Sequence, residues 1–310
     1  QYCVQFVDFD GVLVDGFDVR GEKDGFHFNY GRNFTVRNGV LSTGDDGLAI
    51  NAGDWPDCAP MIGTLENGLA ENIRCLYRRR FDWKKNGSLG ICIAAAWPDW
   101  HEGIVVRRGE PVRVGRRIYF VEGPVSKQEY VSRTMPQHTH GSWKSPEGVS
   151  FLYLQDDGCR TMDIRNVVFR NMTMGAKRGF LCYMDDNEWA RSLHPEVPDA
   201  DAPHTEFTVE KARIETGCAF IRGCGNLDVT LRNVIRTKLS PLVSMGSFNG
   251  RPVVQRIRVS DLTYPEKGDD FVFQGAGIDA EVVVESSDQA RQPTLKVGDG
   301  ARAVVTKSSR

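Results

Sequence analysis

Three aspartates have the residue type and spacing best suited to chemistry in this chain. Asp45 and Asp46 are adjacent, and Asp24-Gly25 recurs as Asp46-Gly47 at an offset of 46 − 24 = 22 residues. Adjacent like charges are unfavourable, and a carboxylate cluster makes its members differ in proton affinity. General acid and base catalysis uses that difference, so the three aspartates are the candidate catalytic residues.

The 22-residue offset also predicts the elements that position the acids. It is too short for a βαβ unit of about 30 residues, and helical periodicity is nearly absent. It fits one coil of a solenoid with about three short strands. Coils stack at about 4.8 Å, which would bring Asp24 beside Asp45 and Asp46. We predict an all-β chain folded as a right-handed parallel β-helix.

Internal repeats support this prediction. Residues 34–41 are echoed at 162–169 and 227–234, and more weakly at 255–262, with Arg37-Asn38 aligned to Arg165-Asn166. Each copy has a short alternating strand, a polar residue and a second short strand. A third strand is expected at 25–29, 47–51, 90–94, 179–184, 241–245 and 271–274.

Four regions follow from where the repeat is present. They are β-helix coils with the acids at 1–101, an inserted small β module at 102–155, further coils at 156–288, and a C-terminal cap or tail at 289–310. Module strands are expected at 112–114, 118–121 and 149–153, with a loop at 136–143. Only about one coil precedes Asp24, so we expect additional N-terminal coils or a partner chain to cap the helix.

Composition narrows the partners. The 310 residues are 40% hydrophobic, and 39 Lys+Arg nearly balance 41 Asp+Glu, which gives no general affinity for nucleic acid. The sequence has no run of 18 apolar residues, so we expect no membrane insertion. We expect no cofactor and no metal, since the cysteines form no Cys-x-x-Cys pair and His101, His138 and His140 lack a ligand spacing. Several cysteines are expected to be buried hydrophobes, with disulfides as the alternative.

Residues 12–53 resemble glycoside hydrolase family 28, the polygalacturonases and rhamnogalacturonan hydrolases. In that family Asn-Thr-Asp-Gly is followed one coil later by Thr-Gly-Asp-Asp-Cys-Ile-Ala-Ile, and Lys23-Asp24-Gly25 and residues 43–50 stand in those places. The resemblance implies a pectin-lyase-like solenoid, here with a small inserted β module. It also implies an inverting glycosidase, secreted or periplasmic, that acts on a cell-wall polysaccharide. Asp45 would be the general acid, and Asp24 and Asp46 would position and deprotonate water.

The chain departs from the family at several places. Leu89 stands where polygalacturonases have a histidine, as is also the case in rhamnogalacturonan hydrolases. The family's Arg-Ile-Lys substrate motif falls on Leu181-Cys182-Tyr183, although Lys177 and Arg178 lie nearby in sequence. The substrate therefore need not be polygalacturonate, and a pectin-related or other acidic or neutral glycan is expected.

Further residues are candidates for substrate binding. His27 alternates with Phe26 and Phe28, so it should point out of the core beside the acids, with a plain surface histidine as the alternative. Aromatic residues on a cleft rim stack on sugars, or here anchor the module. The complete set is His27, Trp97, Trp100, His101, Glu102, Lys177, Arg178 and Tyr183.

The inserted module is similar to small β modules of phage tail proteins and carbohydrate-binding appendages. It would form a glycan-contacting wall, or serve only packing and assembly. Two other functions stay open for the whole chain: a β-helical polysaccharide lyase, and an inactive glycan-binding, tailspike-like protein. A lyase releases an unsaturated sugar that absorbs ultraviolet light, whereas a binding protein shows affinity without turnover.

Overall fold

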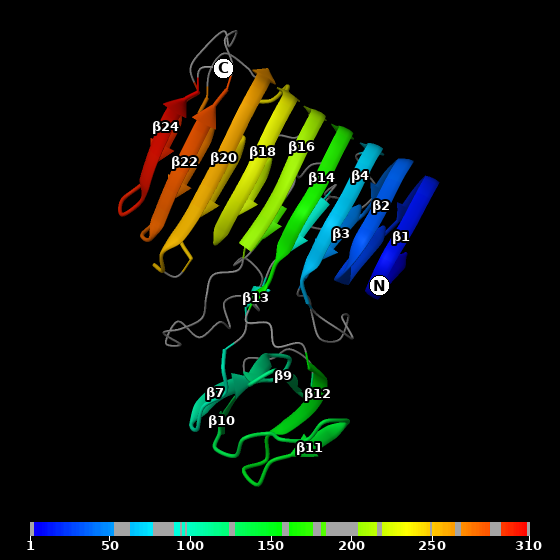
Figure 1. The fold of residues 1–310 in the computed structure, drawn as a ribbon, viewed down its shortest axis with the longest axis vertical. Coiled ribbons are helices and arrows are strands. Elements are labelled where there is room, and N and C mark those ends of the chain that lie inside the picture. Colours follow the sequence, from blue (N-terminus) through cyan, green and yellow to red (C-terminus); the bar gives the residue numbers. More distant parts are fainter. Residues whose placement is uncertain are drawn as a thin grey trace.

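The computed structural model is all-β where it describes the chain. It describes residues 3–52, 63–76, 90–93, 95–96, 98–123, 128–156, 161–175, 181–183, 204–215, 219–248, 250–263, 268–285 and 293–308. Every helix or strand assigned in these ranges is a β-strand (Figure 1). In the same ranges we find no helix with the length and apolar character needed to span a membrane. The predicted all-β class is confirmed for these residues.

Long parallel strands form the first of two rows. Each one hydrogen-bonds the next in chain order, from blue to red in Figure 1. This long-strand row consists of β1 (Val4–Gly21), β2 (Phe26–Thr43), β4 (Leu65–Cys75), β14 (Ile164–Met174), β16 (His204–Ile214), β18 (Asn226–Arg236), β20 (Val253–Thr263), β22 (Ile278–Val284) and β24 (Arg302–Lys307).

Short strands form the second row. The first part of β2 pairs with β3, whereas its later part pairs with β4, so both rows begin from one strand. Strand β15 lies beside β17, which continues the row. This short-strand row consists of β3 (Leu48–Asn51), β5 (Gly90–Ile93), β15 (Leu181–Tyr183), β17 (Ile221–Gly223), β19 (Val243–Gly246), β21 (Phe271–Gln274) and β23 (Leu295–Val297). The strands expected at these places are present.

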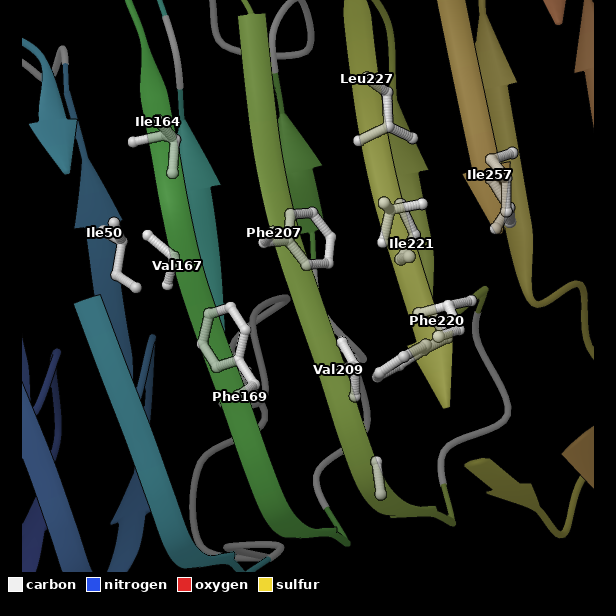
Figure 2. Close-up of a cluster of buried hydrophobic side chains, with 14 of the residues drawn as sticks. Ile50, Ile164, Val167, Phe169, Phe207, Val209, Phe220, Ile221, Leu227 and Ile257 are labelled. Carbon is white, nitrogen blue, oxygen red and sulfur yellow. The ribbon is translucent and has the colours of Figure 1, made fainter. Parts of the chain in front are cut away.

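Apolar side chains fill the space between the rows. Alternate residues of each long strand point inward, so Phe169 of β14 and Val209 of β16 are fully buried. They belong to the same cluster of buried side chains as Phe220, just before β17, and Ile221, the first residue of β17, and Figure 2 shows part of this cluster. Fully burying such a side chain contributes roughly 1.5–3 kcal/mol, so this shared core holds the rows together.

Asparagines bend the long strands at repeated levels. Asn38, Asn72 and Asn171 have φ values of 60°, 55° and 52°, a left-handed conformation that asparagine tolerates better than most residues. Their side chains form a ladder, in which Asn72 donates to Asn38 at 2.9 Å and Asn171 donates to Asn72 at 2.7 Å. The expected pair of short strands around a polar residue is therefore one continuous strand with a left-handed residue inside it.

The ladder corrects the register of the predicted repeat. Asn166 donates to Asn67, which donates to Asn33, so Arg165-Asn166 is level with Arg32-Asn33. Arg37-Asn38 is instead level with Arg170-Asn171, because Arg37 and Arg170 both pair with Glu71. The predicted alignment of the repeat was wrong by five residues, because β2 and β14 each carry two Arg-Asn pairs five residues apart.

An antiparallel module is inserted between β4 and β14. Its strands are β7 (Ile104–Arg107), β8 (Pro111–Val114), β9 (Arg117–Val121), β10 (Glu129–Ser132), β11 (Ser142–Lys144) and β12 (Ser150–Asp156). Strand β11 occupies part of the stretch expected to be loop. On β9, Tyr119 and Val121 face the module's own core, whereas Ile118 and Phe120 join the core of the two rows. β6 (Ala95–Ala96) and β13 (Thr161–Met162) pair where the chain enters and leaves the insertion.

Candidate active site

Three carboxylates meet where the chain enters β2 and passes from β2 to β3. Asp24 precedes β2, and Asp45 and Asp46 lie between the two strands. One carboxylate oxygen from each aspartate lies within 4.8 Å of the others. The backbone N–H of Asp46 also donates to Oδ1 of Asp24 at 3.2 Å. The predicted proximity of the three acids is confirmed.

Glycines allow the two acidic segments to approach each other. The N–H of Gly25 donates to the carbonyl of Asp46 at 2.8 Å, and that of Gly44 donates to Gly21 at 2.9 Å. A Cβ at Gly25 would lie 2.5 Å from the carbonyl oxygen of Gly47, and one at Gly44 would overlap the carbonyl of Glu22. Any larger residue at either position would push the acids apart.

The three acids differ in their surroundings. Asp24 is buried, with 6% of its surface exposed, whereas Asp45 and Asp46 are half-buried. Lys23, to which the sequence analysis gave no role in the site, brings its Nζ to 4.0 Å from Oδ2 of Asp45. A lysine at that distance partly offsets the mutual repulsion of the acids. Asp45 is thus an acid with access to solvent, whereas Asp24 is fixed inside.

A buried thiol lies near the cluster. Burial raises the pKa of Cys75 to about 12, and the negative charge of Asp46 adds to this effect. The thiol is therefore neutral at physiological pH and acts as a small hydrophobe of the core, as expected for this cysteine. Cys92 and Cys182 lie in strands whose side chains are outside the described set, and Cys218 is outside the described residues.

His27 lies inside the molecule, which corrects its predicted position. It is 1% exposed, as buried as Phe26 and Phe28 on the opposite face of the strand. Its Nδ1 is 2.9 Å from Oδ2 of Asp24, and it pairs in register with Ala49 as expected. Alternation placed it opposite the phenylalanines, but here both faces of the strand are covered. A side chain buried to this degree is not available to touch a substrate.

Buried amides extend the contacts of His27, and sequence reasoning missed them. Nδ2 of Asn51 lies 3.5 Å from Nε2 of His27, and Nδ2 of Asn29 donates to the Asn51 carbonyl at 3.0 Å. Gln5 Nε2 donates to Asn29 Oδ1 at 2.9 Å. The repeat carried a signal for two of these residues, because Asn29 and Asn51 end the matching segments 25–29 and 47–51.

The other predicted substrate-binding residues have separate positions. Trp100 packs on the module core, and its Nε1 donates to Ser132 at 2.9 Å, which matches the anchoring alternative. His101 and Glu102 are exposed, and His101 Nδ1 lies 3.2 Å from the Glu102 carbonyl. Tyr183 belongs to β15, but its side chain is outside the described set. Trp97, Lys177 and Arg178 are outside the described residues.

The carboxylate spacing limits what the site can do. Oxygens within 4.8 Å allow one water to hydrogen-bond two acids at ordinary distances of about 2.7–2.8 Å. The same span fits oxygens that share a Ca²⁺ ion at about 2.3–2.6 Å. It is shorter than the roughly 6.5–9.5 Å between carboxyl groups of typical inverting glycosidases.

Comparisons with family models, curated proteins and solved structures find no match for this chain.

Proposed function

We propose that the chain is a glycoside hydrolase that cleaves a cell-wall-type polysaccharide or its oligosaccharides, with Asp24, Asp45 and Asp46 as its catalytic acids. The observation that carries the proposal is the meeting of three carboxylates from segments 22 residues apart, held by a backbone hydrogen bond between them. Family 28 membership remains part of the proposal and rests on the sequence resemblance over residues 12–53.

The proposed architecture is a right-handed parallel β-helix. Two rows of parallel strands that enclose one core are what successive turns of such a helix would produce. Val4 pairs with Phe26, and Phe26 with Leu48, at the offset of one turn. The fold matters to the site because the stacking of turns sets the distance between the acids.

Asp45 is proposed as the general acid, because its side chain is 18% exposed and adjoins two other carboxylates. Asp24 and Asp46 are proposed to hold and deprotonate the attacking water. Oδ1 of Asp24 accepts the Asp46 N–H and Oδ2 faces His27, so this carboxylate is fixed in orientation. A carboxylate fixed in this way is suited to act as a base that positions water. It is less suited to act as a nucleophile, which must approach the sugar.

The stereochemical outcome tests this assignment. The resemblance implies inversion, although the acids are closer together than is usual for inverting enzymes. We therefore propose inversion by a water held between two carboxylates. Proton NMR of the first product should show the anomer opposite to that of the substrate. Appearance of the same anomer would instead assign one aspartate as a nucleophile.

The decisive experiment is an oligosaccharide panel of pectic, other acidic and neutral glycans, read by chromatography. The wild-type protein should shorten at least one substrate, and Asp24→Asn, Asp45→Asn and Asp46→Asn should each lower kcat by at least about 100-fold. Asp279→Asn is the matched control, since its side chain is 59% exposed on β22, and it should retain full activity. Full activity of Asp45→Asn would refute the proposal.

A cation-dependent polysaccharide lyase is the second candidate, favoured by one observation. Three carboxylate oxygens within 4.8 Å match the ligand spacing of a divalent cation. A lyase would form an ultraviolet-absorbing product and lose activity in a chelator, with recovery on adding Ca²⁺. The proposed hydrolase forms no such product. If the panel shows binding without turnover, the protein is a glycan-binding protein instead.

A further inference from the structure

The buried histidine beside Asp24 has two polar neighbours that constrain its protonation. Its Nδ1 lies 2.9 Å from Oδ2 of Asp24, and its Nε2 lies 3.5 Å from the amide nitrogen of Asn51. The strands on either side place Gln5 and Ala49 in register with it, and neither carries a charge. The other charged groups of the acid cluster are Asp45, Asp46 and Lys23, and Lys23 Nζ lies 4.0 Å from Oδ2 of Asp45.

With the Asn51 amide in the orientation that the structure gives it, one form of the ring satisfies both of these contacts. The amide nitrogen of Asn51 is a donor, so the His27 Nε2 facing it must present its lone pair. The single ring proton of neutral histidine is then on Nδ1, where it can be donated to the Asp24 carboxylate. The other tautomer would set two lone pairs against each other at Nδ1 and two donors against each other at Nε2. An imidazolium would repeat the second conflict.

We propose that His27 is a positioning residue that acts as a neutral Nδ1–H donor to Asp24 and does not touch the substrate. It holds one carboxylate oxygen while the Asp46 N–H holds the other. Both oxygens of Asp24 are thereby fixed in orientation beside the other two acids. The catalytic consequence rests on the proposed hydrolase function, whereas the tautomer rests on the geometry alone.

The tautomer can be measured without any substrate. Histidine-selective ¹⁵N labelling and long-range ¹H–¹⁵N NMR at pH 7 distinguish the two neutral tautomers and the imidazolium. The chain has six histidines, so the His27 signals are identified as those absent from His27→Asn. We expect His27 to be the Nδ1–H tautomer, and we expect Asp24→Asn to shift its signals. An Nε2–H tautomer or an imidazolium would overturn the inference.

Kinetics test the positioning role. His27→Leu removes the donor and should lower kcat about 10- to 100-fold, the usual loss for a group that orients a catalytic residue, with KM changed less than about twofold. His27→Asn can place an amide donor near the position of Nδ1 and should recover part of kcat. His204→Asn, on β16, is the control and should match the wild type. An unchanged kcat in His27→Leu, or a loss confined to KM, would overturn the role.

The two hypotheses fail in different ways. A wild-type protein without turnover on the panel refutes the hydrolase, while the NMR result still decides the tautomer. An active wild-type enzyme with the wrong tautomer refutes the role of His27 and leaves the hydrolase standing. If His27→Leu does not fold, His27→Asn and the wild-type spectrum carry the decision.

Discussion

Asn171 donates a 2.7 Å hydrogen bond to Asn72, although the two residues are 99 positions apart in the chain. The whole antiparallel module lies between them in sequence, yet β4 and β14 pair as direct neighbours. The inserted residues therefore leave the stack of long strands uninterrupted. The asparagine ladder crosses the point of insertion and ties the two parts of the stack together.

The ladder gives the first prediction. Asn72→Ala removes both hydrogen bonds of Asn72 and puts alanine at a φ of 55°, so we expect a loss of about 1–3 kcal/mol in the free energy of unfolding. Urea unfolding measures it. Asn72→Gly also removes the amide but relieves the backbone strain, so it should be less destabilising by about 1 kcal/mol. Equal losses in both variants would show that strain plays no part.

Glu147 gives a pH-dependent prediction for the module. Burial alone would raise its pKa, but hydrogen bonds from the backbones of Arg133 and Thr134 and from the Thr134 hydroxyl outweigh it and lower the pKa to about 2. The folded pKa lies below the usual 4.5, so the stabilisation is present above pH 4.5 and lost as the pH falls toward 2.

Glu147→Gln should therefore melt at a lower temperature than the wild type at pH 6, and the gap should close as the pH approaches 2. Calorimetry across this range measures the difference. Glu281→Gln on β22 is the control, and its melting temperature should follow the wild type throughout. A difference in melting temperature that does not depend on pH would mean that Glu147 stabilises the module through its shape and not through its charge.

Much of the stacking of the strands could be predicted, because the offset of the repeat indicates which residues lie side by side. The offset between Asp24-Gly25 and Asp46-Gly47 predicted the meeting of the acids, and the structure shows them within 4.8 Å. Register was not predictable, since strands with two Arg-Asn pairs give two equally good alignments. The strand pairing and the asparagine ladder decide between them.

The burial of His27 could not be predicted from the alternation of apolar and polar residues along the strand. Alternation reports which face of a strand a residue occupies, not whether that face is covered. Phe26 and Phe28 define the core side, but the opposite side is closed by Asn51 and Asp24, which are themselves 3% and 6% exposed. Asn51 on the neighbouring strand β3 and Asp24 just before β2 supply that cover, and alternation within β2 does not encode it.

A buried ion pair joins the two rows and gives a third prediction. Nη2 of Arg236, at the end of β18, lies 3.5 Å from Oδ1 of Asp270, just before β21, and both side chains are at most 1% exposed. Asp270 also accepts a 2.8 Å hydrogen bond from the N–H of Thr294. Asp270→Asn should cost about 3–5 kcal/mol in unfolding free energy, because it removes a counter-charge from a buried arginine.

A double-mutant cycle isolates that interaction. Arg236→Met combined with Asp270→Asn removes both charges and should be less destabilised than the sum of the two single variants. Denaturant unfolding of all four proteins gives the coupling energy. Additive losses would show that the pair contributes nothing beyond the packing of each side chain.

The acid cluster gives the last prediction, which concerns stability. Asp45 lies near two other carboxylates, and its contact with Lys23 is a long 4.0 Å with a lysine side chain that is 62% exposed. An exposed pair of this kind adds little, so repulsion should dominate. Asp45→Asn should then raise the free energy of unfolding at pH 7 by about 0.5–2 kcal/mol, the gain typical of relieving a strained functional site. Calorimetry at pH 7 measures the gain. Asp279→Asn, whose side chain contacts Arg302, should be no more stable than the wild type. A less stable Asp45→Asn would mean that Asp45 is retained for structure, and the case for a catalytic cluster would weaken with it.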